Sequence, residues 1–342
     1  MKAVYISEHG GIDTLTYGDL PDPVPEAGEV LVRVRACALN RLDLWTRSGL
    51  DFWRVRFPHV LGGDIAGEVA ALGPGVRSVA VGARVVLNLG VSCGTCEACL
   101  RGRDNYCPRY LVLGKDLPGG YAELVKAPAV NVVPLPDALG WEQAAALPGV
   151  FVSAWDMLFE KARVEPGEWV LVHAGGSGIG TAAIQLARLA GATVITTAGS
   201  DEKLEKAKAL GAHFGINYTR QDFLREVRRI TAKRGVDVVI EHLGGEVFTR
   251  SLLCLVEGGR LVTCGVTTGW DVRTDLRHIF FRQLRVMGTK FGSKACLSRI
   301  VQLAHEGKIR PVVDRVLPLS EARQAHRILE SREHFGKVVL VP

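Results

Sequence analysis

Residues 169–199 constrain the fold of this 342-residue chain more than any other segment. A β-branched apolar run from Trp169 to Val172 leads into the stretch GGSGIG at 175–180. A helix of small residues follows at 181–189, and a second apolar run at 193–197. This order places backbone N–H groups and the positive end of a helix dipole at one point, which suits a pyrophosphate. The segment therefore predicts a dinucleotide-binding βαβ unit.

The glycine fingerprint departs from the usual pattern at its middle position. Aligned on the last glycine, Ser177 stands where a glycine normally lets the backbone approach phosphate, but serine is small enough for binding to survive. A purely structural glycine turn is the alternative, and the βαβ context makes it the weaker interpretation. The residues expected at the phosphates are Gly175, Gly176, Ser177, Gly178, Ile179 and Gly180.

The end of the second strand favours NADP over NAD. An acidic residue about twenty positions after the first glycine normally binds the ribose 2′-OH of NAD, but here the chain reads Ala198-Gly199-Ser200. No carboxylate is left there to repel a 2′-phosphate, and Lys203 follows one turn into the next helix. The alternative is that Lys203 belongs to the solvated face of a charged helix at 201–210.

Length and composition are typical of a two-domain globular protein, with 47% hydrophobic and 23% charged residues. No apolar run reaches transmembrane length and the N-terminal residues show no signal-peptide core, which predicts a cytoplasmic protein. The net charge of +6 would permit nucleic-acid binding. Because Lys and Arg are spread along the chain without a basic run, we expect no nucleic-acid partner and no membrane partner.

Two hydrophobic patterns divide the chain. Residues 1–149 show short alternating runs separated by Pro and Gly, such as EVLVRVR at 29–35, and predict a small β barrel or sandwich. In residues 150–290 helices and strands alternate, which predicts a six-stranded, doubly wound parallel sheet and an α/β fold class. Residues 291–342 end in a strand at 337–341 and are expected to return to the first domain.

Four of the eight cysteines lie in a short lobe at 91–110, where Cys93, Cys96, Cys99 and Cys107 give the spacing C-x2-C-x2-C-x7-C. Thiolates this close together in a reducing compartment are better explained by a metal than by disulfides. Four sulfur ligands leave no open position, so the pattern predicts a structural zinc site. A four-iron cluster is the alternative, but the last gap is longer than in the ferredoxin motif.

The β-rich front with its cysteine lobe, followed by VLVHAGGSGIG, GVDVVIEHLGG and FGKVVLV, resembles the medium-chain dehydrogenase/reductase family over nearly the whole chain. The resemblance implies a GroES-like catalytic domain made of the N-terminal part and the C-terminal tail, with a Rossmann domain between them. It also implies a small-molecule substrate, a cofactor cleft at the domain junction and a homodimer or homotetramer. On the nicotinamide side it points to Gly265, Val266 and Phe291.

The catalytic zinc of this family is not expected here. Zinc alcohol dehydrogenases of the family hold that ion with a Cys, a His from a His-Glu pair and a second Cys. The positions that align with them in this chain are Asn40, Gly63-Asp64 and Gly149. The resemblance therefore implies that the structural zinc is kept and the catalytic zinc is lost.

These replacements resemble the quinone oxidoreductase branch of the family. Its Asn-x-x-Asp motif corresponds to Asn40 and Asp43, and it uses NADPH, whose 2′-phosphate would meet Ser200, Lys203 and Tyr218 here. That branch usually lacks the cysteine lobe. The chain thus combines the lobe of a zinc enzyme with the active-site pattern of a zinc-free one.

Without zinc, an unactivated alcohol lacks the metal that stabilises its alkoxide. A quinone or an α,β-unsaturated carbonyl is already electron-poor and can accept a hydride from NADPH with positioning and oriented donors alone. We therefore predict an NADP(H)-dependent reductase in which Asn40 binds the acceptor carbonyl or the nicotinamide-side ribose and Asp43 orients the site. The alternative is that Asn40 caps a turn and Asp43 starts a helix.

Two other functions stay open at this point. One is a zinc alcohol dehydrogenase with atypical ligands, and the other is a non-enzymatic NADPH-binding protein such as a redox sensor. The atypical ligands would come from Cys37, Asp43, His59 and Asp64. Large aromatic residues are expected to line the substrate pocket, namely Trp45, Phe52, Trp53 and Trp270.

Overall fold

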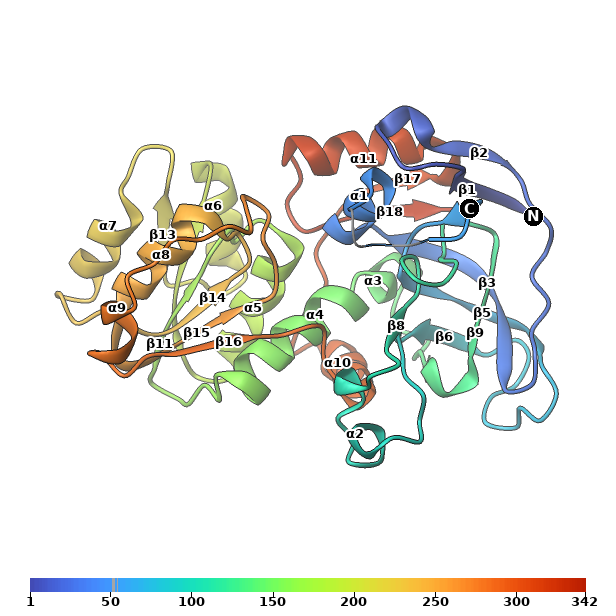
Figure 1. Cartoon of the computed structure of the whole chain (residues 1–342), viewed down its shortest axis with the longest axis horizontal. Helices are drawn as coiled ribbons and strands as arrows, with labels where there is room; N and C mark the ends of the chain where they lie inside the picture. Colours follow the sequence, from blue (N-terminus) through green and yellow to red (C-terminus); the bar gives the residue numbers. More distant parts are fainter. Residues whose placement is uncertain (51–52, 54) are drawn as a thin grey trace. The chain divides into compact units, whose positions relative to one another are not determined.

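The computed structural model describes residues 1–50, 53 and 55–342, which form two compact units (Figure 1). Unit 1 contains Met1–Val152 and Ser293–Pro342, and unit 2 contains Ser153–Gly292. The C-terminal residues therefore belong to the same unit as the N-terminal ones. None of the helices in the described part of the chain is both long and apolar enough to cross a membrane.

Unit 1 is built on a seven-stranded sheet, with smaller sheets and short helices around it. Its strand order is β10 (Val132–Pro134), β6 (Arg84–Leu87), β5 (Asp64–Leu72), β3 (Glu29–Ala38), β18 (Lys337–Val341) and β17 (Val313–Pro318), and β9 (Leu124–Pro128) also pairs with β3. The smaller sheets are β2 (Thr16–Asp19), β1 (Lys2–Ile6) and β4 (His59–Val60), and the pair β7 (Gly90–Val91) and β8 (Leu111–Val112). The helices are α1 (Arg41–Ser48), α2 (Glu97–Leu100), α3 (Trp141–Ala145), α4 (Pro148–Trp155, which ends in unit 2), α10 (Lys294–His305) and α11 (Ala322–Ser331).

The register between β3 and β18 positions the polar residues of unit 1. Strand β3 alternates buried valines with more exposed residues, as a strand with one face on a core does. Strand β18 runs antiparallel to it and pairs Leu340 with Cys37 and Val339 with Ala38. Continued by two residues, this register brings Lys337 opposite Asn40, the residue that precedes α1.

Unit 2 contains a six-stranded sheet in which every pair of neighbours is parallel. The order is β13 (Phe214–Asn217), β12 (Thr193–Ala198), β11 (Trp169–Val172), β14 (Val236–Glu241), β15 (Leu255–Thr263) and β16 (Arg285–Gly288). This is the doubly wound dinucleotide-binding order, so the predicted α/β fold class is confirmed. The helices are α5 (Gly178–Leu189), α6 (Asp201–Ala209), α7 (Phe223–Ile230), α8 (Gly245–Cys254) and α9 (Arg277–Phe280).

Candidate functional site

The glycine-rich turn lies where β11 ends and α5 begins. Ser177 is the N-cap of α5, and its hydroxyl accepts a hydrogen bond from the Gly180 N–H at 3.0 Å. A Cβ at Gly180 would lie 2.2 Å from the Ala174 carbonyl oxygen, and one at Gly175 would lie 2.3 Å from Thr196 Oγ1. Both glycines are therefore required by close packing, and the N-terminus of α5 is held at the carboxyl end of β11, where a pyrophosphate binds in such folds.

The residues predicted at the 2′-phosphate gather at the carboxyl end of β12. Ser200 caps α6 and accepts a hydrogen bond from the Lys203 N–H at 3.3 Å. A Cβ at Gly199 would lie 2.8 Å from the Tyr218 hydroxyl, so that half-exposed ring lies directly against the strand end. Gly199, Ser200, Lys203 and Tyr218 thus share one edge of the sheet.

A carboxylate stands near this edge, but its charge is compensated. Asp201 accepts a hydrogen bond from Asn217 Nδ2 at 2.8 Å and is paired with Arg220. These hydrogen bonds, that from Asn217 first, lower the pKa of Asp201. The carboxylate repels a bound phosphate less as a result, and Arg220 adds a cation that the sequence patterns did not single out.

The residues assigned to the nicotinamide side follow the ends of neighbouring strands. Val266 comes after β15 and Phe291 after β16, which pair in parallel. A Cβ at Gly265 would lie 3.1 Å from the His242 carbonyl oxygen, and His242 Nε2 is 3.1 Å from Ser177 Oγ. Burial lowers the pKa of His242 to about 4, so its ring is neutral beside the glycine turn.

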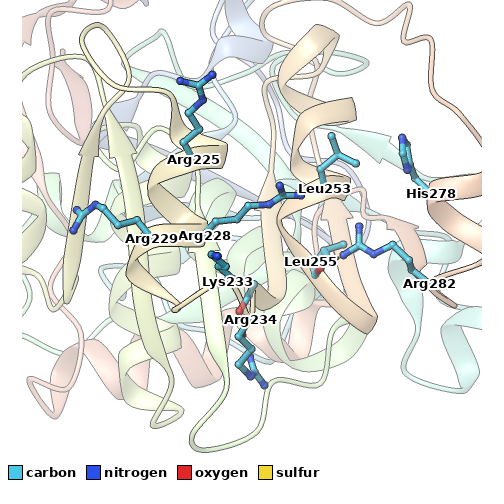
Figure 2. Close-up of a pocket in the computed structure, with 10 residues that line it drawn as sticks. Arg225, Arg228, Arg229, Lys233, Arg234, Leu253, Leu255, His278 and Arg282 are labelled. Carbon is cyan, nitrogen blue, oxygen red and sulfur yellow. Dashed lines mark hydrogen bonds between the residues drawn. The ribbon is translucent and has the colours of Figure 1, made fainter.

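A second feature of unit 2 is a pocket lined by basic side chains at the opposite edge of the sheet (Figure 2). Gly235 and Leu255 lie in it at the starts of β14 and β15, whereas the glycine turn follows the end of β11. Because the starts and the ends of parallel strands lie at opposite edges of the sheet, the pocket is separate from the dinucleotide site. The sequence led us to expect scattered charges, but six cationic side chains line this pocket: Arg225, Arg228, Arg229, Lys233, Arg234 and Arg282. Two of them are paired with carboxylates, Arg229 with Glu226 and Arg234 with Asp237.

The four clustered cysteines of unit 1 converge on one point. The sulfur atoms of Cys93, Cys96, Cys99 and Cys107 all lie within 4.8 Å of one another. Two of the separations are 3.9 Å (Cys93 to Cys99) and 3.5 Å (Cys96 to Cys99). Sulfur atoms on a tetrahedral zinc with 2.3 Å bonds would be about 3.8 Å apart. The cluster therefore fits a structural zinc ion.

The backbone around the cysteine lobe is arranged to receive thiolates. The N–H groups of Cys96 and Arg109 each point at a cysteine sulfur at 3.4 Å, Cys93 and Cys107 respectively. Hydrogen bonds from the backbone at Thr95 and Cys96 lower the pKa of the Cys93 thiol to about 5. Donors of this kind stabilise the deprotonated sulfur that a metal requires.

A second polar group in unit 1 is centred on the buried ammonium of Lys337. Its Nζ lies 2.6 Å from Asn40 Oδ1 and 3.0 Å from Asp64 Oδ2. The exposed fractions of the Lys337 and Asp64 side chains are 4% and 0%. The structure thus brings Asn40, which lies between β3 and α1, and Asp64, which begins β5, together around a cation from the last strand.

Gly149 completes this group at the beginning of α4. Its N–H donates to Asp64 Oδ1 at 2.8 Å. A Cβ at position 149 would lie 2.8 Å from that oxygen and 3.3 Å from Asn40 Nδ2. Asn40, Asp64 of the Gly63-Asp64 pair and Gly149 therefore lie together, and these are the three segments that the family resemblance aligns with the zinc ligands of related enzymes.

Asp43 lies next to this group, in the first turn of α1. Its carboxylate accepts hydrogen bonds from the Asn40 N–H at 2.7 Å, the Tyr121 hydroxyl at 3.2 Å and the Gly62 N–H at 3.3 Å. Burial raises the pKa of Asp43 to about 7, although the Asn40 N–H and the charge of Lys337 act in the opposite direction. Asn40 is the N-cap of α1, so both predicted residues also occupy the helix-start positions of the alternative interpretation.

A hydrogen-bond network of side chains extends from Asp43 towards α11. Tyr121 Oη lies 3.3 Å from His326 Nε2, and Arg47 Nη1 lies 3.1 Å from His326 Nδ1. Burial and the neighbouring Arg47 lower the pKa of His326 to about 3. An arginine cannot release a proton, so the neutral His326 must accept from Arg47 and donate to Tyr121. This hydrogen-bond network therefore orients Asp43 and does not conduct protons.

Comparison with known families assigns both parts of the chain. Residues 26–137 match the alcohol dehydrogenase GroES-like domain, and residues 178–306 match the zinc-binding dehydrogenase domain. A quinone oxidoreductase from Rattus norvegicus is 30% identical over 100% of this chain and 98% of its own length. The chain belongs to the medium-chain dehydrogenase/reductase family.

Other relatives show the range of activities in this family. An acryloyl-coenzyme A reductase from Metallosphaera sedula is 31% identical over 99% of this chain and 99% of its own length. A solved structure described as an NAD-dependent alcohol dehydrogenase is 48% identical, covers 100% of both chains and superposes with a TM-score of 0.97. This medium-chain dehydrogenase/reductase is therefore an oxidoreductase.

The residues of this chain do not fit the catalytic zinc site of its family. Within the described ranges, the cysteine lobe is the one group of three or more His, Cys, Asp or Glu side chains arranged to bind a metal. The other position supplies one amide from Asn40 and one carboxylate from Asp64, and both already bind the Lys337 ammonium. A cation there would have to displace the ammonium and would find no side chain at Gly149. The residues at this position therefore bind a lysine ammonium and do not form a metal site.

Sequence reasoning missed Lys337, Tyr121 and His326 as parts of this group. The motif FGKVVLV marked the family, but only pairing with β3 shows where its lysine lies. Among the predicted pocket walls, Trp45 lies in α1, Trp270 is 70% exposed in unit 2, and the Trp53 ring lies 4.8 Å from Lys115 Nζ. Phe52 lies outside the described residues.

Proposed function

We propose that this oxidoreductase uses NADPH to reduce an activated carbonyl acceptor, either a quinone or an α,β-unsaturated carbonyl, without a catalytic metal. The observation that carries the proposal is the lysine ammonium bound to Asn40 and Asp64. The family resemblance aligns Asn40 and the Gly63-Asp64 pair with ligands of the catalytic zinc in related enzymes. Without a metal to stabilise an alkoxide, oxidation of a simple alcohol is disfavoured. An electron-poor acceptor does not need that assistance.

The cofactor would be held by unit 2. When bound, NADPH supplies the hydride. The N-terminus of α5 and the turn at 175–180 would bind the pyrophosphate. Ser200, Lys203 and Tyr218 would surround the 2′-phosphate, because they share the strand edge where an NAD enzyme carries an acidic residue. Gly265, Val266 and Phe291 would line the nicotinamide.

The chemistry on the acceptor is assigned to unit 1. The Asn40 amide would donate a hydrogen bond to the acceptor carbonyl or to the nicotinamide-side ribose. Asp43 would hold Asn40 in place, because its carboxylate accepts a hydrogen bond from the Asn40 backbone N–H at 2.7 Å. Preorganised donors of this kind stabilise negative charge that develops on an oxygen during reaction.

The cysteine lobe would hold one structural zinc ion through Cys93, Cys96, Cys99 and Cys107. Closed tetrahedral sites of this type stabilise a loop and leave no position for substrate. Because reduced thiols and NADPH both suit a reducing compartment, we assign the enzyme to the cytoplasm. We also expect a homodimer or homotetramer, the usual state in this family.

The names of the relatives support two activities. The rat quinone oxidoreductase and the archaeal acryloyl-coenzyme A reductase are named for electron-poor acceptors, since an acryloyl group is an α,β-unsaturated thioester. The 48% identical structure described as an NAD-dependent alcohol dehydrogenase favours a second candidate, alcohol oxidation with NAD. The two candidates differ in acceptor, cofactor and need for metal.

A single panel of assays separates the two candidates. Purified protein is tested with NADPH and NADH against a benzoquinone and a cyclic enone, and with NADP and NAD against simple primary and secondary alcohols, each with and without a chelator. We expect NADPH-dependent reduction that the chelator does not inhibit, with the enone converted to the saturated ketone. Chelator-sensitive alcohol oxidation without enone reduction would select the second candidate.

A further inference from the structure

Lys337 is a buried cation in unit 1 whose role goes beyond compensation of a charge. Strand pairing brings it beside Asn40, 297 positions away in the sequence, and its ammonium donates to one amide oxygen and one carboxylate. Burying an ammonium is costly unless it is paired and hydrogen-bonded. Asp64 supplies the counter-charge, and the shorter bond, to Asn40, satisfies a second N–H donor and holds the amide oxygen.

The bond to Lys337 determines which way the Asn40 amide faces. An ammonium can donate hydrogen bonds but cannot accept them, so the amide oxygen must face Lys337. The Nδ2 group then faces away from the ammonium, and it lies 3.3 Å from the Cβ position of residue 149, which is itself 2.8 Å from Asp64 Oδ1. Residue 149 is a glycine and fills none of that space with a side chain. The Asn40 amide therefore presents its N–H donors, and not its oxygen, next to Gly149 and the Asp64 carboxylate.

We propose that Lys337 is the positioning residue that turns Asn40 into a fixed hydrogen-bond donor for the acceptor oxygen. This inference rests on the proposed reduction of an activated carbonyl. The ammonium polarises the amide by holding its oxygen, which strengthens the Nδ2–H donors. Without it the amide could rotate and present its oxygen instead, which would repel a carbonyl oxygen.

For an enone, the proposed reaction is a hydride transfer followed by a protonation. Bound NADPH would supply a hydride to the β-carbon as a C–H bond of its nicotinamide ring breaks. The π pair of the carbon–carbon double bond would shift to form a double bond between the α-carbon and the carbonyl carbon, and the π pair of the carbonyl would move onto its oxygen. That oxygen, now negative, accepts the hydrogen bond from Asn40 Nδ2. A proton from water would then add at the α-carbon, and the products would be NADP, the saturated ketone and hydroxide.

Two simpler roles for Lys337 make different predictions. If the ammonium only compensates Asp64, removing both charges should restore stability and activity together. If it binds a cofactor phosphate, its removal should weaken NADPH binding. A positioning role predicts that kcat falls and stays low when the Asp64 charge is also removed, while the Kd for NADPH changes little.

The test uses Lys337→Met, Lys337→Arg and the double variant Lys337→Met/Asp64→Asn in the full chain. We expect Lys337→Met to lower kcat for enone reduction about 100-fold, in line with removal of an oxyanion donor, and Lys337→Arg to retain more of it. In the double variant the midpoint of thermal unfolding should recover but kcat should not. The Kd for NADPH, read from its fluorescence, should change less than about threefold.

Lys126→Met is the matched control, because Lys126 is also paired with carboxylates, at 2.8 Å (Glu26) and 3.0 Å (Glu29), but lies on β9 outside this group. Its kcat should equal that of the wild type. If Lys337→Met does not fold, the double variant, which leaves no unpaired charge, carries the comparison. Recovery of kcat in the double variant, or a large rise in the NADPH Kd with kcat unchanged, would overturn the inference.

A further measurement separates failure of the inference from failure of the proposed function. If the wild type reduces none of the acceptors, the proposed function is wrong. The thermal unfolding of wild type, Asn40→Ala, Lys337→Met and their double variant then decides the inference. A lysine that holds the Asn40 amide requires non-additive effects on the unfolding midpoint, and strictly additive effects contradict it.

Discussion

The raised pKa of Asp43 makes a quantitative prediction about stability and pH. Burial raises this pKa to about 7 from a reference value of 3.8. Between these two pH values the native state therefore holds a proton that the unfolded chain has lost. The free energy of unfolding contributed by this group consequently falls as pH rises from about 4 to about 7. Three pKa units correspond to about 4 kcal/mol.

Buried histidines make the free energy of unfolding change with pH in the opposite direction, so the experiment needs a control that contains the same histidines. Burial lowers the pKa values of His173 and His326 to about 3 and that of His242 to about 4, so these groups stabilise the fold as pH rises. Comparison of the wild type with Asp43→Asn removes these shared contributions. The asparagine is similar in shape and carries no titrating proton.

The assay is urea unfolding of both proteins at pH 5 and pH 8, with linear extrapolation to water. Relative to Asp43→Asn, the wild type should lose most of the 4 kcal/mol over this interval, about 3 kcal/mol. Equal pH dependence in the two proteins would show that Asp43 titrates alike in both states and would refute the reasoning.

Three further predictions concern the cofactor, the zinc lobe and the acceptor site. Lys203→Ala should raise the Kd for NADPH about tenfold by loss of one phosphate contact and leave the Kd for NADH unchanged, as measured by fluorescence titration. Cys96→Ser should release zinc from the cysteine lobe and lower the midpoint of thermal unfolding, which metal analysis and calorimetry would detect. Asn40→Ala should lower kcat about 100-fold with little change in the Kd for NADPH, and an unchanged kcat would remove Asn40 from the mechanism.

The glycine turn and the cysteine cluster could be predicted from the sequence because each is formed by residues that lie close together in the chain. The glycine turn and the helix after it are set by neighbouring residues, and Gly175 and Gly180 meet backbone or side-chain atoms that exclude a Cβ. The cysteine cluster likewise depends on a single loop. In both cases the chemistry lies within about thirty residues of chain, so no long-range pairing was needed to infer it.

The proposed acceptor site could be predicted only in part, because its residues come from strands that are distant in the sequence. Asn40 and Asp43 were recognised by their motif. Lys337 lies 273 positions from Asp64, and only the pairing of β18 with β3 places it there. The sequence pattern also gives little sign of strand β13, since its four residues include Gly215 and a partly exposed Phe214 that weaken the apolar pattern.

The metal content of the active enzyme tests the central claim most directly. Protein that reduces a quinone or enone with NADPH is dialysed, and zinc per chain is measured by mass spectrometry on the same sample. The account predicts one zinc per chain, bound by the cysteine lobe, and a reductase rate that persists when that sample is treated with a chelator. Two zinc ions per chain, with loss of the rate when one is removed, would contradict it.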